Sequence, residues 1–153
     1  MIIALLKYLK KIKSLGFVFI GLGTILLISI IFGLIFPGAS SGNPIVLKNI
    51  YYKFFVGVLI TPIIETAISQ AIPFYLVNTY IKTKKKRYIF IFISPVLFIH
   101  TFNLGYIGAS YLIGIILAFF YYVAHFRKEN SILLISMIHC MNNLIAFSTF
   151  YLP

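Results

Sequence analysis

Residues 55–80 read FVGVLITPIIETAISQAIPFYLVNTY, an apolar run with a single acidic residue, Glu65, in its middle. A transmembrane helix needs about 20 predominantly apolar residues, so this run is long enough to cross a membrane. Glu65 is one of only two acidic residues in the chain, and the other, Glu129, lies in a short charged segment. An acid at the centre of a membrane span must face protein or a water-filled cavity, which makes Glu65 a candidate functional residue.

The composition of the whole chain indicates a polytopic membrane protein. Of its 153 residues 61% are hydrophobic and only 10% are charged, and the mean hydropathy is +1.06. A typical soluble domain has about 25% charged residues. We therefore predict an all-α fold, a polytopic transmembrane helical bundle formed by residues 15–153 as a single membrane-embedded domain. Residues 1–14 form a basic amphipathic segment, which we expect to be a helix at the membrane interface.

Five segments are candidate spans, and Pro95 lies within the shortest of them. The first is too long for the apolar core of a signal peptide, which has roughly 7 to 15 residues, so we interpret it as an uncleaved span. The predicted spans are approximately residues 15–36, 55–80, 88–104, 107–126 and 131–151.

The basic residues support this count and suggest an orientation. The formal net charge is +11, and every Lys and Arg except Lys48 and Lys53 lies in one of three clusters. The clusters precede the first span, separate the second from the third, and separate the fourth from the fifth, so five spans place all of them on one side. Cytoplasmic loops carry such an excess, which predicts a multi-pass cell-membrane protein with a cytoplasmic N-terminus. The expected partner is the lipid bilayer, and we expect no nucleic-acid binding.

Polar residues in three of the predicted spans lie at similar depth. His100 is in the third span and His139 in the fifth. His139 and Asn143 are four residues apart and His100 and Asn103 are three apart, so each pair shares a helix face. With Glu65 in the second span, these residues predict a common polar interior to which three helices contribute.

Prolines accompany the polar residues. Pro62 and Pro73 flank Glu65, and Pro95 precedes His100. A proline removes a main-chain donor and can kink its helix, and in a membrane the freed carbonyl groups must be satisfied by neighbouring groups. The prolines are therefore consistent with a cavity near Glu65, and equally with a simple distortion of the helices.

The order of these motifs resembles the CAAX prenyl protease and bacteriocin-processing family of intramembrane proteases. The family motif E-E-x-x-x-R corresponds to ETAISQ at residues 65–70, and F-x-x-x-H ends here at His100. The motif H-x-x-x-N corresponds to HCMNN at residues 139–143. The resemblance covers the motif core, residues 55–150, and members of the family are described either as glutamate-dependent proteases or as metalloproteases.

This chain departs from the family pattern at three positions. Thr66 replaces the second Glu, Gln70 replaces the Arg, and Val96 replaces the Phe of the second motif. The family's second Glu and its Arg are four residues apart and suited to an ion pair. Replacing both by neutral residues avoids the stranded charge that a single replacement would leave.

The resemblance implies an intramembrane endopeptidase that cleaves peptide or protein tails at the membrane. Glu65 would activate water together with His100, and His139 and Asn143 would stabilise the oxyanion. No cofactor is certain, because Glu65, His100 and His139 could instead hold a divalent metal such as zinc. A bacterial member is implied, located in the inner (plasma) membrane, with bacteriocin-leader processing or self-immunity as its role. The supporting residues of the predicted site are Thr66, Gln70 and Asn103.

Two other functions remain open at the level of sequence. A non-catalytic immunity or scaffold protein with the same fold would explain the loss of the second Glu and the Arg. A proton- or cation-coupled transporter would also use an intramembrane Glu and His, although the chain has no internal repeat of the kind found in many transporters. The single cysteine, Cys140, excludes an internal disulfide. The oligomeric state is unknown from the sequence.

Overall fold

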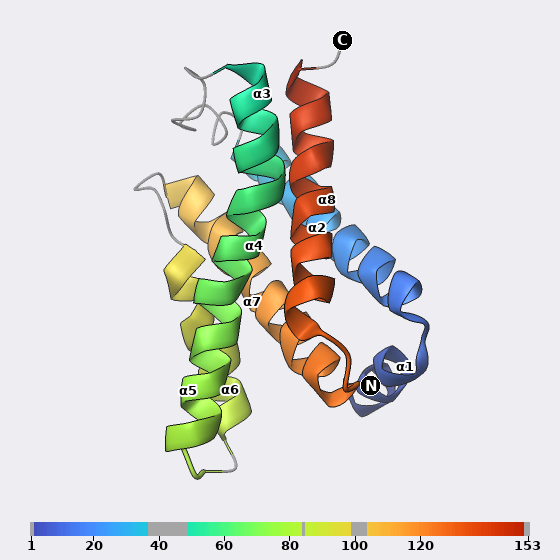
Figure 1. Ribbon diagram of the computed structural model, residues 1–153, viewed down its shortest axis with the longest axis vertical. Helices are drawn as coiled ribbons and strands as arrows, with labels where there is room; N and C mark the ends of the chain where they lie inside the picture. Colours follow the sequence, from blue (N-terminus) through green and yellow to red (C-terminus); the bar gives the residue numbers. More distant parts are fainter. Residues whose placement is uncertain (1, 37–48, 84, 99–103, 152–153) are drawn as a thin grey trace.

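The computed structural model describes residues 2–36, 49–83, 85–98 and 104–151, which form an all-α bundle (Figure 1). Four helices are long and apolar enough to cross a membrane. The predicted all-α class and transmembrane character are therefore confirmed. Two predicted site residues, His100 and Asn103, lie outside the described residues.

Two of the predicted spans and the predicted N-terminal segment agree closely with helices of the structure. The first span corresponds to α2, which begins one residue earlier than predicted, and the fifth corresponds to α8 with the predicted limits. The basic N-terminal segment forms the short helix α1. The bounds are α1 Ile2–Lys11, α2 Ser14–Ile35, α7 Leu104–Phe126 and α8 Ser131–Tyr151.

The second predicted span is one continuous helical rod that extends from Ile50 to Tyr80. At 1.5 Å per residue its 31 residues are about 46 Å long, which exceeds the roughly 30 Å hydrocarbon core of a bilayer. Asn49 begins the rod as an N-cap, since its side chain accepts the N–H of Tyr51 at 2.9 Å. The rod alternates α-helical turns with two wide π-helical turns, η3 and η4. Its parts are α3 Ile50–Tyr52, η3 Lys53–Ile60, α4 Thr61–Thr66, η4 Ala67–Ala71 and α5 Ile72–Tyr80.

The third predicted span, residues 88–104, lies partly outside the described residues, since 99–103 are not among them. Its described part consists of the α-helix α6 (Lys86–Ile93) and the 3₁₀-helix η5 (Ser94–Phe98). Together they rise about 22 Å, less than the roughly 30 Å hydrocarbon core. Pro95 lacks the N–H that would continue the α-helical ladder, and this accounts for the change of helix type. The described residues therefore contain four full-length spans and the first part of the third predicted span.

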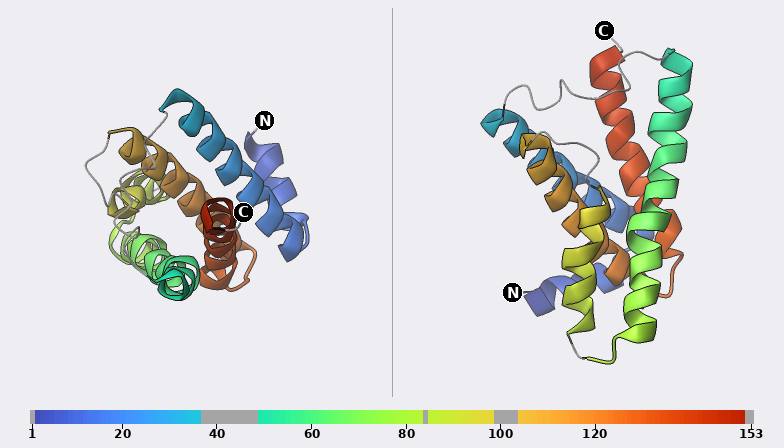
Figure 2. Two further views of the ribbon diagram at one scale, coloured as in Figure 1. Left: turned by 90° about the horizontal axis from the view of Figure 1, so that it is seen from above. Right: turned by 90° about the vertical axis from the view of Figure 1, so that its left-hand side faces the viewer.

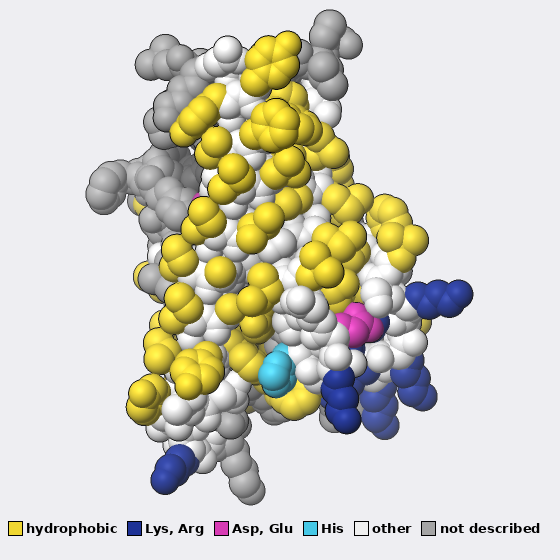
Figure 3. Space-filling view, in the orientation of Figure 1, with side chains coloured by type: hydrophobic (Ala, Val, Ile, Leu, Met, Phe, Trp, Pro, Cys, Tyr) yellow, Lys and Arg dark blue, Asp and Glu magenta, His cyan; other side chains and the backbone are white. Residues whose placement is uncertain are grey.

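The helices alternate in direction, so several connections meet at one end of the bundle. Helix α1, the α5–α6 turn and the α7–α8 turn lie together at this end, while the C-terminal end of α8 lies at the other (Figures 1 and 2). Lys and Arg side chains gather at the same end in the space-filling view (Figure 3). The short α6–η5 segment thus preserves the alternation that the basic clusters predicted. We call this part of the molecule the basic end.

Helix α8 occupies a central place because it packs against α2, α7 and α4. Viewed from above, α2 and α7 run side by side and are tilted relative to α8 (Figure 2). Gly21 allows the close approach of α2 and α8, since a Cβ atom added there would lie only 2.6 Å from Cδ1 of Ile138. The most buried apolar side chains at these contacts are Phe17, Val18, Ile25, Leu117, Ala118, Val123, Ala124, Ile135 and Ile138.

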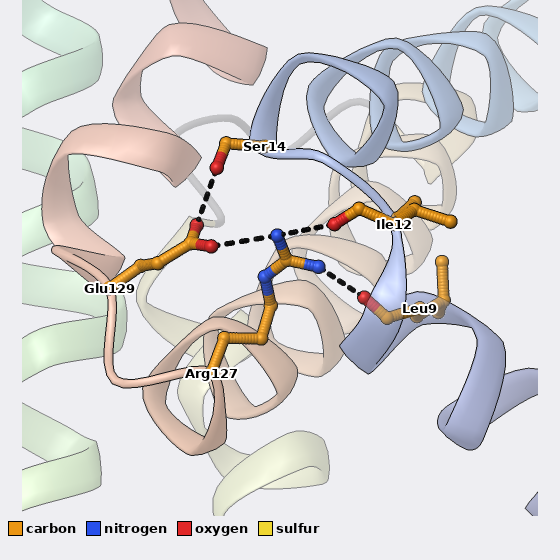
Figure 4. A network of polar contacts seen from close by, with 5 residues as sticks. All are labelled: Leu9, Ile12, Ser14, Arg127 and Glu129. Atoms are coloured by element: carbon orange, nitrogen blue, oxygen red, sulfur yellow. Dashed lines mark hydrogen bonds and ion pairs between the residues drawn. The ribbon is translucent and has the colours of Figure 1, made fainter.

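A polar network at the basic end attaches α1 to the turn between α7 and α8 (Figure 4). The Arg127 guanidinium donates to the carbonyl of Leu9 and, at 2.8 Å, to the carbonyl of Ile12. It also donates to Glu129 at 2.8 Å, and Glu129 accepts the hydroxyl of Ser14 at 3.1 Å. The last carbonyl groups of a helix have no partner within the helix, so Arg127 supplies the donors that cap α1.

Candidate functional site

Glu65 and His139 face one another between α4 and α8. His139 Nε2 lies 3.5 Å from Glu65 Oε2, and the two side chains are 11% and 20% exposed. Glu65 is at the midpoint of the rod, Ile50–Tyr80, and His139 is within one residue of the midpoint of the apolar stretch Ser131–Thr149. The structure therefore brings a carboxylate and an imidazole together at the mid-depth of two membrane-spanning helices. Such residues are rare in lipid and mark functional sites by default.

A hydrogen bond from Asn143 fixes the register of α8 against the rod. Asn143 Nδ2 donates to the carbonyl oxygen of Gly57 at 2.9 Å. In η3 the Thr61 N–H reaches back five residues to the carbonyl of Val56, so the next donor in this register would be residue 62 to Gly57. Residue 62 is a proline and has no N–H. The Asn143 amide therefore takes the place of a missing main-chain donor, and one of its two N–H groups is committed to that contact.

Near Pro95, too, a side chain donates a hydrogen bond to a main-chain carbonyl. Because Pro95 has no N–H, the helical turn before it contains a carbonyl group without a main-chain donor. In that turn the carbonyl of Phe92 accepts the hydroxyl of Tyr111 at 3.1 Å. At Gly57 and at Phe92, each near a proline, a side chain from a neighbouring helix donates a hydrogen bond to the main-chain carbonyl.

Four buried side chains on the rod, η5 and α8 have polar atoms without a partner within the described residues. Thr66, Gln70 and Ser94 are 0% exposed and Ser136 is 5% exposed. Within the described residues no hydrogen-bond partner reaches their hydroxyl groups or either polar atom of the Gln70 amide. Burying such an atom without a partner costs about 1 to 3 kcal/mol. These side chains therefore destabilise the helix packing around them.

Other hydroxyl residues of the bundle behave differently. Thr24 donates to the carbonyl of Ile20 at 2.8 Å, and Ser148 donates to the carbonyl of Leu144 at 2.9 Å. Both bonds stay within one helix, as is usual for Ser and Thr. The unsatisfied hydroxyl groups near Glu65 are consequently a local feature of the site and not a general property of the bundle.

The predicted site residues fall into three groups. Glu65, His139 and Asn143 lie along the contact between the rod and α8. Thr66 and Gln70 are buried on the rod and, within the described residues, donate to and accept from no other group. His100 and Asn103 lie outside the described residues.

Sequence reasoning missed the contributions of Ser94, Ser136 and the Gly57 carbonyl. Ser136 precedes His139 by three residues and so shares its helix face, a spacing that could have identified it. Pro62 could have indicated a free carbonyl four or five residues upstream.

The donor set at this position suits a metal ion in part. Two ligand atoms of a tetrahedral zinc with bonds of 2.0 to 2.1 Å lie about 3.3 Å apart. The Glu65–His139 separation of 3.5 Å is close to this value. Within residues 2–36, 49–83, 85–98 and 104–151 no group of three or more His, Cys, Asp and Glu side chains gathers at one point. The third ligand predicted from the sequence, His100, lies outside the described residues.

Comparisons with protein-family models, with curated proteins and with solved structures gave no match to this chain. The fold and the candidate site therefore depend on the residues and contacts described above.

Proposed function

We propose that this protein is an intramembrane endopeptidase that cleaves a peptide or protein tail presented at the membrane. The proposal is supported chiefly by one observation, the 3.5 Å approach of His139 to Glu65 at the mid-depth of two spanning helices. A carboxylate held beside an imidazole in a water-poor environment is a suitable general base for hydrolysis. The resemblance to the CAAX prenyl protease and bacteriocin-processing family is part of the same proposal.

In the proposed mechanism Glu65 accepts a proton from a water molecule as the water oxygen attacks the peptide carbonyl. Glu65 then passes the proton to the leaving amine, so the peptide bond is exchanged for a carboxyl group and an amine. The contact with His139 supports a role for this residue in orienting the Glu65 carboxylate. The second N–H of Asn143 and the His139 imidazole would donate to the developing oxyanion. His100 would complete the site by orienting the water.

The same peptidase activity could instead depend on a metal ion. Glu65 and His139, together with His100, would then hold a divalent ion such as zinc. When bound, such an ion polarises a carbonyl group and lowers the pKa of bound water. Glu65 as a ligand would no longer be a free base, so the two forms assign this residue different roles.

The test is cleavage of membrane-anchored peptides by the purified protein in detergent. A peptide library in which each member carries one apolar anchor and a variable tail is incubated with the wild type and with Glu65→Gln. Loss of a general base lowers the rate by about 10² to 10⁴-fold, so Glu65→Gln is expected to abolish detectable cleavage. The matched control is Glu129→Gln, which removes the only other acid and should leave cleavage intact.

Metal content measured on the same samples separates the two forms of the mechanism. Zinc that co-purifies with the wild type and is lost in both Glu65→Gln and His139→Ala would support the metal-dependent form. Equal cleavage by Glu65→Gln and the wild type would overturn the peptidase proposal in both forms.

The alternative functions give different results in the same variants. A non-catalytic immunity or scaffold protein would retain its cellular phenotype in Glu65→Gln. A proton-coupled transporter would show proton flux in liposomes that Glu65→Gln abolishes, without any cleavage. The single mid-span acid within the described residues favours the peptidase, because a proton relay usually has several titratable groups in series.

We also propose that the basic end lies at the cytoplasmic face of the cell membrane. The gathering of Lys and Arg side chains at one end supports this orientation (Figure 3), because cytoplasmic loops carry an excess of these residues. Anionic lipids of that leaflet would contact the same side chains.

A further inference from the structure

The unsatisfied polar side chains of the rod and of η5 lie on elements that pack together. Thr66 is the last residue of α4, Gln70 is in η4, and Ser94 begins η5. The elements η4 and η5 are in contact. All three side chains are 0% exposed, and within the described parts of the chain none has a hydrogen-bond partner. Buried polar side chains of this kind in a membrane cannot be satisfied by lipid.

We propose that Thr66, Gln70 and Ser94 form a water-binding site, which fills when η5 separates from η4. The use of this water in hydrolysis rests on the proposed peptidase function, whereas the hydration of the site does not. Thr66 directly follows Glu65 in the chain, so the site lies at the same depth of the rod as the proposed general base.

The chemistry of the three side chains selects water over other ligands. Two hydroxyl groups and one amide carry no charge, and together they offer both donors and acceptors. A cation would need carboxylate or several carbonyl oxygens, and an anion would need basic groups, neither of which these side chains supply. An apolar ligand would leave the amide unsatisfied. Buried water typically makes about three hydrogen bonds to such groups.

The exposure of the side chains shows why an opening motion is required. A side chain with 0% exposure has no void large enough for a water molecule beside it. The arrangement described here is therefore the closed form of the site. In this form the polar atoms are shielded from solvent and no hydrogen bond replaces their contacts with water. Hydration lowers the free energy of the open form relative to this one.

The segment α6–η5 is the element suited to this motion. Pro95 has no N–H, so it interrupts the main-chain hydrogen bonding of this segment. Phe90 anchors α6 near the basic end through ring contacts with Phe74 at 5.2 Å and Tyr121 at 6.1 Å. In the proposed opening α6 stays anchored, and η5, which also packs against α7, moves away from η4 at the interruption made by Pro95.

The test places a reporter thiol in the site and measures its contact with water. Ser94→Cys in a Cys140→Ala background is exposed to hydroxyl radicals produced from water by a short X-ray pulse, and oxidation at position 94 is followed by mass spectrometry. Radicals arise from bound water as well as bulk water, so the method reports hydration in the interior. The matched control is Leu117→Cys, since Leu117 is also 0% exposed but lies in the apolar core.

We expect oxidation at position 94 to be several-fold faster than at position 117. Equal rates at the two positions would overturn the proposal, because they would mean that the site is dry. Both variants are first checked for wild-type elution in detergent, and Thr66→Cys replaces Ser94→Cys if the latter does not fold.

A second variant tests the part assigned to Gln70. Adding Gln70→Leu to Ser94→Cys removes two hydrogen-bonding atoms with little change in volume, so oxidation at position 94 should fall toward the control rate. An unchanged oxidation rate at position 94 would mean that Gln70 does not help to bind the water.

Adding Glu65→Gln separates this inference from the proposed function. Glu65→Gln should abolish cleavage and leave oxidation at position 94 unchanged. Fast oxidation without any cleavage by the wild type would retain the water site and refute its use in hydrolysis.

Discussion

The two acidic residues of this chain occupy environments that differ in how fully polar groups are satisfied. Glu129, at the basic end, accepts a 2.8 Å hydrogen bond from Arg127 and a 3.1 Å bond from Ser14. Glu65, at mid-depth, lies 3.5 Å from His139. Its neighbours Thr66 and Gln70 have no partner within the described residues.

This difference indicates different purposes for the two regions. The Arg127–Glu129 network stabilises a connection between helices and satisfies main-chain groups. The Glu65 region retains several unsatisfied polar atoms, which reduce stability, whereas in the Arg127–Glu129 network only Nε of Arg127 lacks a partner within the described residues. Buried polar groups without hydrogen-bond partners are expected at functional sites. The predictions below test whether the two acids differ as this comparison requires.

The largest expected difference is in activity. Glu65→Gln should lower peptide cleavage by about 10² to 10⁴-fold, as expected for loss of a general base. Glu129→Gln should leave cleavage within about twofold of the wild type, because its carboxylate lies at the basic end and makes no contact with the site. The measurement is the initial rate of cleavage of one peptide from the library. Similar losses in both variants would mean that the comparison fails.

The second prediction concerns stability at the basic end. Arg127→Ala leaves the carbonyls of Leu9 and Ile12 without their donor, and should lower the free energy of unfolding by about 2 to 4 kcal/mol. Unfolding in mixed detergent micelles measures the change, and faster proteolysis of α1 locates it. Arg127→Lys keeps the charge but not the forked geometry, so it should restore only part of the loss. An α1 that is equally protected in Arg127→Ala would contradict the capping role.

The third prediction concerns the hydrogen bond from Asn143 to the Gly57 carbonyl. Asn143→Ala should cost about 1 to 2 kcal/mol in the wild-type background. Pro62→Ala restores an N–H that can reach Gly57, so the same substitution should cost about 1 kcal/mol less in that background. A double-mutant cycle of unfolding free energies measures this coupling. Additive effects would show that Pro62 does not create the need for Asn143.

The smallest expected effect is the salt dependence of the Glu129 contact. Glu129 is 31% exposed, so Glu129→Gln should cost less than about 1 kcal/mol, and the cost should shrink as salt is added. Glu65→Gln should change stability independently of salt, because its contact with His139 lies between helices at mid-depth. Unfolding at low and high ionic strength provides the measurement. A salt-sensitive effect at Glu65 would indicate that bulk solvent surrounds this residue.

Much of the fold could be predicted from hydropathy and charge. The limits of α2 and α8 were predicted within one residue, because long apolar runs bounded by polar segments have few other interpretations. The rod begins at Ile50, five residues before the predicted limit of 55. Asn49 caps the helix at this point, and the helix includes Lys53, which lies outside the apolar run. The change from α-helix to 3₁₀-helix at Pro95 was not predicted, because hydropathy does not register the type of helix.

The candidate site could be predicted only in part. Depth and helix face were sufficient to bring Glu65 and His139 together, since both are near the midpoints of neighbouring spans. The bond from Asn143 could not be predicted, because the π-helical register that exposes the Gly57 carbonyl leaves no mark on the pattern of apolar residues. Ser94 was also missed, because most hydroxyl residues in helices bond to their own helix and only packing reveals the exceptions.

The cap that Arg127 places on α1 has a consequence for biosynthesis. Arg127 and Leu9 are 118 positions apart in the chain. At a translation rate of about 5 to 20 residues per second, roughly 6 to 24 s pass between the synthesis of the two. During that interval the N-terminal helix emerges from the ribosome without the hydrogen bonds from Arg127. These bonds can form only after the turn between α7 and α8 has been made.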